Sequence, residues 1–332
     1  MNRKTLSVSI AAYNISDYIK KTLDFLLVEE TYRDKLDVII VNDGSKDDTL
    51  KIVEDYSARF PNCIQVINKN NGGYGSTINS SLAIAKGTYF KLLDGDDWFD
   101  KKELRGLIDY LETVESDLII SPYYEVTNKK TWIAHYPDIP KAPSVIANLK
   151  LNNKFTRFQM HGLTVRTETI RKFGCSITEK CFYTDFEFVF YCVMASKTIS
   201  RCDNAVYCYR LGIEGQSVSL TGMRKHYLDY HVVAERVFQC YCDHVLKVHG
   251  TKKMILERSV GFYIYCIFNT YMLLENPEDH RKELIEFDEM VLKKYPVAWE
   301  AGTNSKIVYC VRKLRFHFYN VFCRYMLWKL IH

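Results

Sequence analysis

The sequence predicts an α/β protein in which helices flank a mainly parallel sheet, with a helical C-terminal region after it. Two observations support this fold class. Between residues 6 and 121, short runs rich in Val, Ile and Leu alternate with segments of helical periodicity, which is typical of strand–helix–strand units. From residue 221 onward, apolar residues recur at helical spacing and Gly and Pro become sparse. We therefore expect a sheet-containing part over residues 1–220 and a helical part over residues 221–332.

The elements of the first part follow from these patterns. Short β-rich runs predict strands at residues 6–11, 37–41, 64–67, 89–93 and 117–121. Helical periodicity predicts helices at residues 16–27, 47–60, 76–85 and 101–112. Ser45 and Asp48 fit the start of the second helix, and Pro61 fits its end. Residues 123–220 look irregular, with a proline-marked loop near residues 137–143.

Composition narrows the classes of function. The chain has 45 basic and 40 acidic residues, and a net charge of +5 is too balanced to indicate a nucleic-acid-binding protein. Its eleven cysteines are odd in number and include no Cys-x-x-Cys pair, so we expect reduced thiols in the cytoplasm. The longest uncharged run, residues 259–274, is shorter than the ~20 residues needed to span a bilayer. A buried helix is expected there.

Three predicted strands end in polar residues. Strand 6–11 is followed by Tyr13, strand 37–41 by Asp43, and strand 89–93 by Asp-Gly-Asp-Asp at residues 94–97. Ligands of open α/β sheets bind beyond the carboxyl ends of strands, so these residues are candidates for one site. Tyr13 can stack on a base, Asp43 can accept hydrogen bonds from a base or ribose, and Asp96 can bind Mg²⁺ or Mn²⁺. Three neighbouring carboxylates repel one another, so a cation is expected between them.

A glycine-rich segment lies between these strand ends. Gly72, Gly73 and Gly75 precede the helix expected at residues 76–85. Glycines let the backbone approach a ligand closely, and a helix start offers N–H groups. The segment lacks the Gly-Lys-Ser/Thr ending of a P-loop and does not match Gly-x-Gly-x-x-Gly. Together with the acidic strand end, it suits a nucleotide diphosphate with a divalent cation.

Four segments together resemble glycosyltransferase family 2, the inverting enzymes with the GT-A (Rossmann-like) fold. They are SVSIAAYNISDYIKKTLDFLL, VIIVNDGSKDDTLKIV, NNGGYGSTINSSLAIAKGTYFKLLDGDDW and YTDFEF. The resemblance implies a GT-A domain over residues 1–220. In the family, the last Asp of a D-x-D motif binds the metal, which implies a site for Mn²⁺ or Mg²⁺ at Asp94 and Asp96. It also places Asp185 at the position of the general base. The expected nucleotide-binding residues are Ala11, Tyr13, Asn14, Asp43, Gly73 and Asp94.

The resemblance implies a metal-dependent, inverting transferase that moves one sugar from a nucleotide donor, expected to be a UDP-sugar. The expected acceptor is a hydroxyl of a glycan or lipid-linked oligosaccharide in cell-surface polysaccharide synthesis. Members commonly have Pro where this chain has Ala11 and Asp where it has Asn42, so the chain departs from the family at these two positions and keeps Asp43. The Gln-x-x-Arg-Trp pattern of processive relatives is absent, and Gly-Gln-Ser-Val-Ser at residues 215–219 stands in that region, which favours single transfers.

Alternatives remain open at this point. One is a nucleotide-sugar-binding protein without activity, against which Asp185 and the intact acidic cluster count. A sugar-nucleotide pyrophosphorylase fits less well, because a Gly-rich basic loop is expected after its first strand and AAYNISDY is not one. Glu187 is the rival of Asp185 for the general base. His161 is expected to be a structural histidine, although it could touch the acceptor or diphosphate, and Arg210 could bind phosphate or form a surface ion pair.

The last 27 residues, 306–332, carry six Lys and Arg residues and no carboxylate. On a single helix most of these cations would lie away from an apolar side formed by Ile307, Val311, Leu314, Phe318, Val321 and Tyr325. Such a helix could rest on an anionic membrane surface or pack on its own domain. We therefore expect the protein in the cytoplasm, with peripheral contact at the inner face of the cell membrane as one option.

Overall fold

The structure is a computed structural model, and it describes residues 4–152, 155, 157–212 and 219–331. The chain divides into two compact units, residues 1–212 and residues 213–332. The division expected at residue 220 stays a proposal, because residues 213–218 lie outside the described part. Residues 215–218 of the Gly-Gln-Ser-Val-Ser segment also lie outside the described part.

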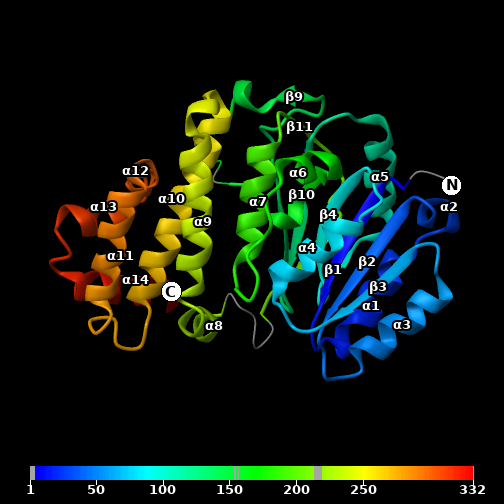
Figure 1. Cartoon of the computed structure of the whole chain (residues 1–332), viewed down its shortest axis with the longest axis horizontal. Helices are drawn as coiled ribbons and strands as arrows, with labels where there is room; N and C mark the ends of the chain where they lie inside the picture. The colour runs from blue at the N-terminus through cyan, green and yellow to red at the C-terminus, as the bar shows by residue number, and fades with distance from the viewer. Residues whose placement is uncertain (1–3, 153–154, 156, 213–218, 332) are drawn as a thin grey trace. The chain divides into compact units, whose positions relative to one another are not determined.

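The first unit is built on an eight-stranded sheet in the order β3-β2-β1-β4-β10-β6-β11-β9 (Figure 1). These strands are β1 (Leu6–Ala12), β2 (Leu36–Asp43), β3 (Ile64–Lys69), β4 (Tyr89–Asp94), β6 (Leu118–Ile120), β9 (Ser144–Val145), β10 (Leu163–Arg166) and β11 (Thr198–Arg201). Only β10 and β9 run antiparallel to their neighbours in this described sheet. The predicted mainly parallel sheet is confirmed. Every residue of β2 is buried, which explains its apolar run.

Helices cover the sheet as expected. The four predicted helices are α1 (Ser16–Leu26), α3 (Thr49–Arg59), α4 (Tyr74–Ile84) and α5 (Lys101–Thr113), with the short α2 (Glu30–Arg33) between the first two. In α1 the side chains of Ile19, Leu23 and Leu26 are buried at the spacing of a helix that packs on a core. The carboxylate of Asp100 caps α5, since it accepts hydrogen bonds from the N–H groups of residues 102 and 103 at 2.9 and 3.0 Å.

The region that looks irregular in the sequence is structured. It contributes β10, β11 and β9 to the main sheet, and most of a second sheet in the order β5-β12-β7-β8. The members of this second sheet are β5 (Trp98–Phe99), β7 (Tyr123–Val126), β8 (Thr131–Ala134) and β12 (Tyr207–Arg210). The strands of this region have two to four residues, which is too short to show a clear period of two. Two helices, α6 (Thr167–Phe173) and α7 (Thr184–Ala195), complete the unit.

The second unit is helical, as predicted. Its helices are α8 (Leu220–Lys225), α9 (Asp229–His244), α10 (Gly250–Met272), α11 (Arg281–Lys294), α12 (Pro296–Gly302), α13 (Lys306–Lys313) and α14 (Tyr319–Ile331). The long helices α9 and α10 lie side by side (Figure 1). The run at residues 259–274 forms most of α10, and Val260, Ile264 and Ile267 are fully buried there. Among the described helices, none combines the length and apolar character that crossing a membrane requires.

The prediction of one amphipathic helix over residues 306–332 is wrong. Residues between α13 and α14 turn the chain, because Arg315, Phe316 and Phe318 adopt left-handed backbone angles with φ of 49°, 59° and 60°. The expected apolar side is split by this turn: Val311 is buried, whereas Val321 is exposed.

Candidate functional site

Three polar strand ends meet at one edge of the main sheet. In the parallel register, Ala11 of β1 pairs with Asp94 of β4, and Ala12 pairs with Asn42 of β2. Asp43, the last residue of β2, therefore lies at the same edge as the acidic residues after β4. The sequence predicts that the polar ends of these three strands lie together, and the strand pairing confirms it.

The loop after β1 is tied to the loop after β2. Asn14 has a left-handed φ of 51°, its N–H donates to the Ser45 hydroxyl at 3.0 Å, and its side-chain oxygen accepts from the Lys46 N–H at 2.8 Å. The expected helix-capping role of Ser45 is therefore wrong, since α3 begins at Thr49 and the Ser45 hydroxyl serves the β1 loop. Tyr13 stands next to this junction and is 49% exposed, so its ring is accessible to a ligand.

The carboxylate of Asp43 organises the glycine-rich segment. Its Oδ1 accepts hydrogen bonds from the Lys69 ammonium (3.0 Å) and the Gly72 N–H (2.9 Å), and its Oδ2 accepts from the Gly73 N–H (2.8 Å). Gly73 has a φ of +80°, which strains any residue with a side chain. Asp43 is only 3% exposed. Its main contacts are thus internal, and the lone pairs that remain for a ligand are few.

The three carboxylates after β4 have different surroundings. Asp97 is buried and accepts from the Tyr207 hydroxyl and the Arg210 N–H, each at 2.7 Å. Asp94 is half-buried and accepts from the Tyr74 hydroxyl at 2.7 Å. The Asp96 carboxylate has no hydrogen bond to another residue in the described part of the chain, and it too is half-buried. Asp96 therefore keeps the most acceptor capacity for a ligand.

Burial and mutual repulsion make this cluster hard to ionise. Burial, followed by the nearby Asp96 charge, raises the pKa of Asp94 to about 7. Burial and the charges of Asp94 and Asp96 hold the pKa of Asp97 well above its ordinary value. Burial also raises the pKa of Asp96, while the Arg210 guanidinium opposes that shift. A divalent cation would relieve this repulsion, so the donor set fits a hard metal ion.

His161 joins this cluster, which the sequence did not predict. One ligand atom each from Asp94, Asp97 and His161 lie within 4.8 Å of one another. The imidazole stacks on Tyr209 with ring centroids 4.0 Å apart, and its Nδ1 is buried without a hydrogen-bond partner among the described residues. Burial, with the Lys91 charge, lowers the pKa of His161 to about 3, so the ring is neutral and able to accept a cation. No local signal around residue 161 points to Asp94.

Asp185 and Glu187 lie in the first turn of α7 but differ in environment. Glu187 is fully buried, and its two oxygens accept from the Thr178 N–H and the Tyr191 hydroxyl, each at 2.9 Å. Asp185 is half-buried, and burial raises its pKa to about 6. Its charge acts on Asp94, whose pKa it helps to raise. Of the two acids, Asp185 is the one less committed to holding the fold together.

The segment that leads into α7 packs against the glycine-rich segment. The Lys180 N–H donates to the Gly72 carbonyl at 2.6 Å, and a side chain at Gly75 would collide with the Thr178 carbonyl oxygen. Gly75 is therefore required for this close approach. The contact brings the start of α7 to the edge of the sheet that holds Asp43.

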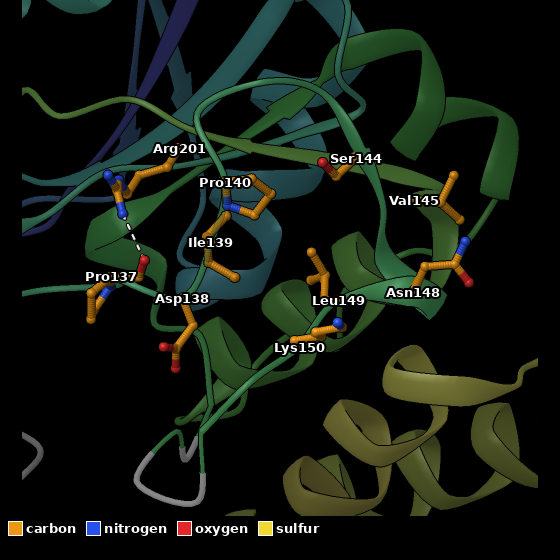
Figure 2. Close-up of a pocket in the computed structure, with 10 residues that line it drawn as sticks. All are labelled: Pro137, Asp138, Ile139, Pro140, Ser144, Val145, Asn148, Leu149, Lys150 and Arg201. Atoms are coloured by element: carbon orange, nitrogen blue, oxygen red, sulfur yellow. Dashed lines mark hydrogen bonds between the residues drawn. The ribbon is translucent and has the colours of Figure 1, made fainter.

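A surface hollow of about 540 Å³ lies elsewhere in the first unit. Figure 2 shows its lining residues, which come from residues 137–150 and from Arg201 of β11, and Arg201 donates to the Pro137 carbonyl at 2.8 Å. Strands β11 and β9 are separated from β4 by β10 and β6. None of the predicted site residues lines this hollow, so we do not assign the nucleotide to it.

Comparison with known proteins gives a consistent result. The sequence profile described as "Glycosyl transferase family 2" matches residues 7–182. An uncharacterized glycosyltransferase of Mycoplasma genitalium is 31% identical over 211 residues, which is 60% of this chain and 64% of that protein. The uncharacterized glycosyltransferase EpsJ of Bacillus subtilis is 32% identical over 129 residues, 39% of this chain and 37% of that protein. The match therefore spans less than two thirds of either relative.

Two solved structures share the fold over most of the chain. TarS of S. aureus in complex with UDP-GlcNAc has a TM-score of 0.55 and 20% identity, covering 88% of this chain and 91% of that one. The mannosyltransferase PcManGT from Pyrobaculum calidifontis, in complex with GDP-Man and Mn²⁺, has a TM-score of 0.52 and 12% identity, covering 98% and 86%. At these identities the likeness shows the fold alone, and it confirms the expected fold class.

Proposed function

The chain belongs to glycosyl transferase family 2, and from this premise we propose that it transfers a single sugar from a nucleotide donor, with inversion, to a hydroxyl acceptor. The observation that carries the proposal is the acidic cluster at the carboxyl end of β4 with Asp185 beside it. The expected donor is a UDP-sugar. Solved proteins of the same fold contain UDP-GlcNAc or GDP-Man, which supports a nucleotide-sugar donor without choosing between them.

We propose that the donor nucleotide lies across the ends of β1, β2 and β4. The exposed ring of Tyr13 stacks on the base, with Ala11 and Asn14 beside it. Asp43 acts mainly by holding the N–H groups of Gly72 and Gly73, so that the backbone of this turn can approach the nucleotide. Its expected direct contact with the base or ribose is limited to the lone pairs that these bonds leave.

Mn²⁺ or Mg²⁺ is the proposed cofactor, with Asp94 and Asp96 as its protein ligands. Asp97 already accepts a hydrogen bond on each oxygen, so we assign it to holding the acidic turn rather than to the metal. A bound divalent cation supplies positive charge against the diphosphate leaving group. One ring nitrogen of His161 lies within 4.8 Å of an oxygen of Asp94 and of Asp97, so the neutral ring offers a further nitrogen atom.

Asp185 is the proposed general base. A sugar hydroxyl is a poor nucleophile until a carboxylate within hydrogen-bond reach accepts its proton. Because burial raises the pKa of Asp185 to about 6, its carboxylate is a stronger base than an exposed one and is still ionised at neutral pH. Attack on the side opposite the departing diphosphate inverts the anomeric carbon. The proposed acceptor is a hydroxyl of a glycan or lipid-linked oligosaccharide for cell-surface polysaccharide, reached from the cytoplasm.

A panel of nucleotide sugars tests the donor assignment. We expect one UDP-sugar to raise the apparent melting temperature in the presence of Mn²⁺, because a ligand that binds only the folded state stabilises it. The same sugar nucleotide without metal should give a much smaller rise. Stabilisation by nucleotide monophosphates alone, with no dependence on metal or on the diphosphate, would contradict the proposed site. Binding of the sugar nucleotide without any turnover would instead favour the non-catalytic alternative.

The pH dependence of transfer tests the base. Asp185 must be ionised to accept a proton, so the rate should rise about tenfold per pH unit below about pH 6 and level off above it. The rate falls at low pH because protonation removes the carboxylate that acts as the base. Since the pKa of Asp185 is raised, this protonation takes place closer to neutral pH than for an exposed Asp. Rates measured from about pH 5 to about pH 8, with circular dichroism to confirm folding at each pH, check this. A flat profile across pH 6 would rule out Asp185 as the titrating group.

A further inference from the structure

The segment formed by α13, the turn at residues 314–318 and α14 presents an exposed surface that is both apolar and basic. We propose that this surface docks the protein on an anionic lipid bilayer. Docking through this surface does not require sugar transfer, so it can be tested independently of the donor site. We refer to the exposed apolar row Val321, Tyr325 and Trp328 as the outer stripe of α14.

Helix α14 is apolar on two opposite sides. Tyr319, Cys323 and Met326 are buried, and they form the side that packs within the second unit, where α14 contacts α10. The outer stripe lies on the other side at helical spacing of four and three residues, with its members 60%, 52% and 58% exposed. Packing within the described unit explains the first side and leaves the second one facing solvent.

Further exposed apolar side chains lie in the same segment as the outer stripe. Phe318 and Leu314, in the turn before α14, are 68% and 41% exposed, and Tyr309 of α13 is 47% exposed. The rings of Tyr325 and Trp328 stack with centroids 6.4 Å apart. Single exposed apolar residues are ordinary, but a row of three at helical spacing, as in the outer stripe, marks an interaction surface.

Cations border the outer stripe. At 3.6 residues per turn, Arg324 and Lys329 fall on its two flanks, and both are exposed. Neither makes an ion pair with another residue in the described part of the chain. Lys306, Lys313 and Arg315 are also exposed in this segment, which contains no Asp or Glu. This positive charge is complementary to anionic headgroups.

Arg312 shows what an internal cation looks like in the same segment. Its guanidinium donates to the Asp288 carboxylate at 2.6 Å and to the Trp299 carbonyl at 2.7 Å, and its side chain is 6% exposed. The fold therefore uses Arg312 and leaves the other Lys and Arg side chains of the segment to solvent. The positive charge of the exposed surface therefore comes from cations other than Arg312, the one whose ion pair holds the fold together.

Two features favour a bilayer over a second copy of the chain. Trp and Tyr side chains are suited to the membrane–water boundary, where the ring is buried and the polar atom stays hydrated. In a symmetric dimer through this surface, like charges would face one another, because the segment has no carboxylate to pair with them. A bilayer that contains anionic lipid avoids that repulsion and covers the outer stripe.

The test is co-sedimentation of the full chain with vesicles. One set contains equal parts of phosphatidylglycerol and phosphatidylcholine, and the other contains phosphatidylcholine alone. We expect binding to the first set only, weakening as NaCl is raised. The double variant Arg324→Gln/Lys329→Gln should bind about 30-fold more weakly, since each cation near an anionic surface contributes on the order of 1 kcal/mol. Trp328→Ala should bind at least about tenfold more weakly.

Matched controls remove the same chemistry from elsewhere. Lys282→Gln/Lys293→Gln takes two exposed cations from α11, and Trp132→Ala takes an exposed Trp from β8 that is 48% exposed. Both should bind like the unaltered chain. Point variants are preferable to deletion from residue 306, which would uncover the side of α10 that α14 covers.

Three results would overturn the proposal: no binding of the unaltered chain to anionic vesicles, equal losses in the controls, or undiminished binding at high NaCl. Light scattering, which measures the molar mass in solution, tests whether a second copy of the chain covers this surface instead. A dimer that Trp328→Ala converts to a monomer, without any lipid binding, would assign this surface to a second copy of the chain.

Discussion

Replacing Asp185 by Asn should reduce sugar transfer by about 10²–10⁴-fold while metal-dependent binding of the nucleotide sugar persists. The amide has nearly the same size as the carboxylate but accepts no proton, so the acceptor hydroxyl loses its base. Nucleotide binding should persist because the donor is assigned to the ends of β1, β2 and β4. The measurement is single-turnover transfer, with thermal stabilisation by donor and Mn²⁺ as the binding readout.

Two controls sharpen this experiment. Asp138→Asn changes an acid that lines the hollow of Figure 2, and its side chain can still accept the Asn152 N–H that Asp138 accepts at 3.0 Å. We expect turnover close to that of the unaltered chain. Glu187→Gln should instead lower thermal stability, because the buried carboxylate accepts from Thr178 and Tyr191. If Asp185→Asn retains full turnover while Glu187→Gln is folded and inactive, the base is Glu187.

Replacing Asp96 by Asn should lower transfer by on the order of 10²–10³-fold and abolish stabilisation by Mn²⁺ with the donor. The reason is that the Asp96 carboxylate has no hydrogen bond to another described residue and is available to a cation. Without a ligand, the folded protein should tolerate the change, since neutralising one member of a crowded acidic cluster relieves repulsion. Calorimetry with and without Mn²⁺ and the donor measures the stability of the variant and its stabilisation by the metal. The single-turnover assay measures the loss of transfer.

Asp97→Asn is the matched comparison and should behave differently. Asn can accept only one of the two hydrogen bonds that Asp97 receives from Tyr207 and Arg210, so the free energy of unfolding should fall by about 1–3 kcal/mol. If Asp96→Asn keeps its response to Mn²⁺ while His161→Phe loses it, the metal is held by the group that contains His161 and Asp97. Phe preserves the stacking on Tyr209 but offers no nitrogen.

The surroundings of Asp43 show that a polar residue at a strand end can be engaged by internal hydrogen bonds. A carboxylate after a strand in an α/β sheet is naturally read as a ligand contact. Here most of its hydrogen-bonding capacity goes to Lys69 and to the N–H groups of Gly72 and Gly73. Its contribution to donor binding is therefore expected to pass through the backbone of that turn as much as through direct contact.

Much of the fold and the shared polar edge of the candidate site could be predicted because the signals are local. Strands of six to eight residues such as β2 and β4 are long enough to show an apolar run, and the polar residues that follow them are adjacent in sequence. The helices that cover them are amphipathic, as in α1, so their period is visible. Parallel pairing then places Asp43 and Asp94 at one edge without further information.

What the sequence by itself determined is the class of fold, the acidic strand end and the acid at the start of α7. Tertiary structure alone decided which carboxylates are available to a ligand. Asp97 accepts hydrogen bonds from Tyr207 and Arg210, and Glu187 accepts them from Thr178 and Tyr191. Tertiary structure also brought a ring nitrogen of His161 within 4.8 Å of an Asp94 oxygen. It also decided that residues 306–331 form two helices with an exposed apolar stripe. The physical reason is that hydrogen bonds and burial join residues distant in the chain, and local periodicity carries no information about them.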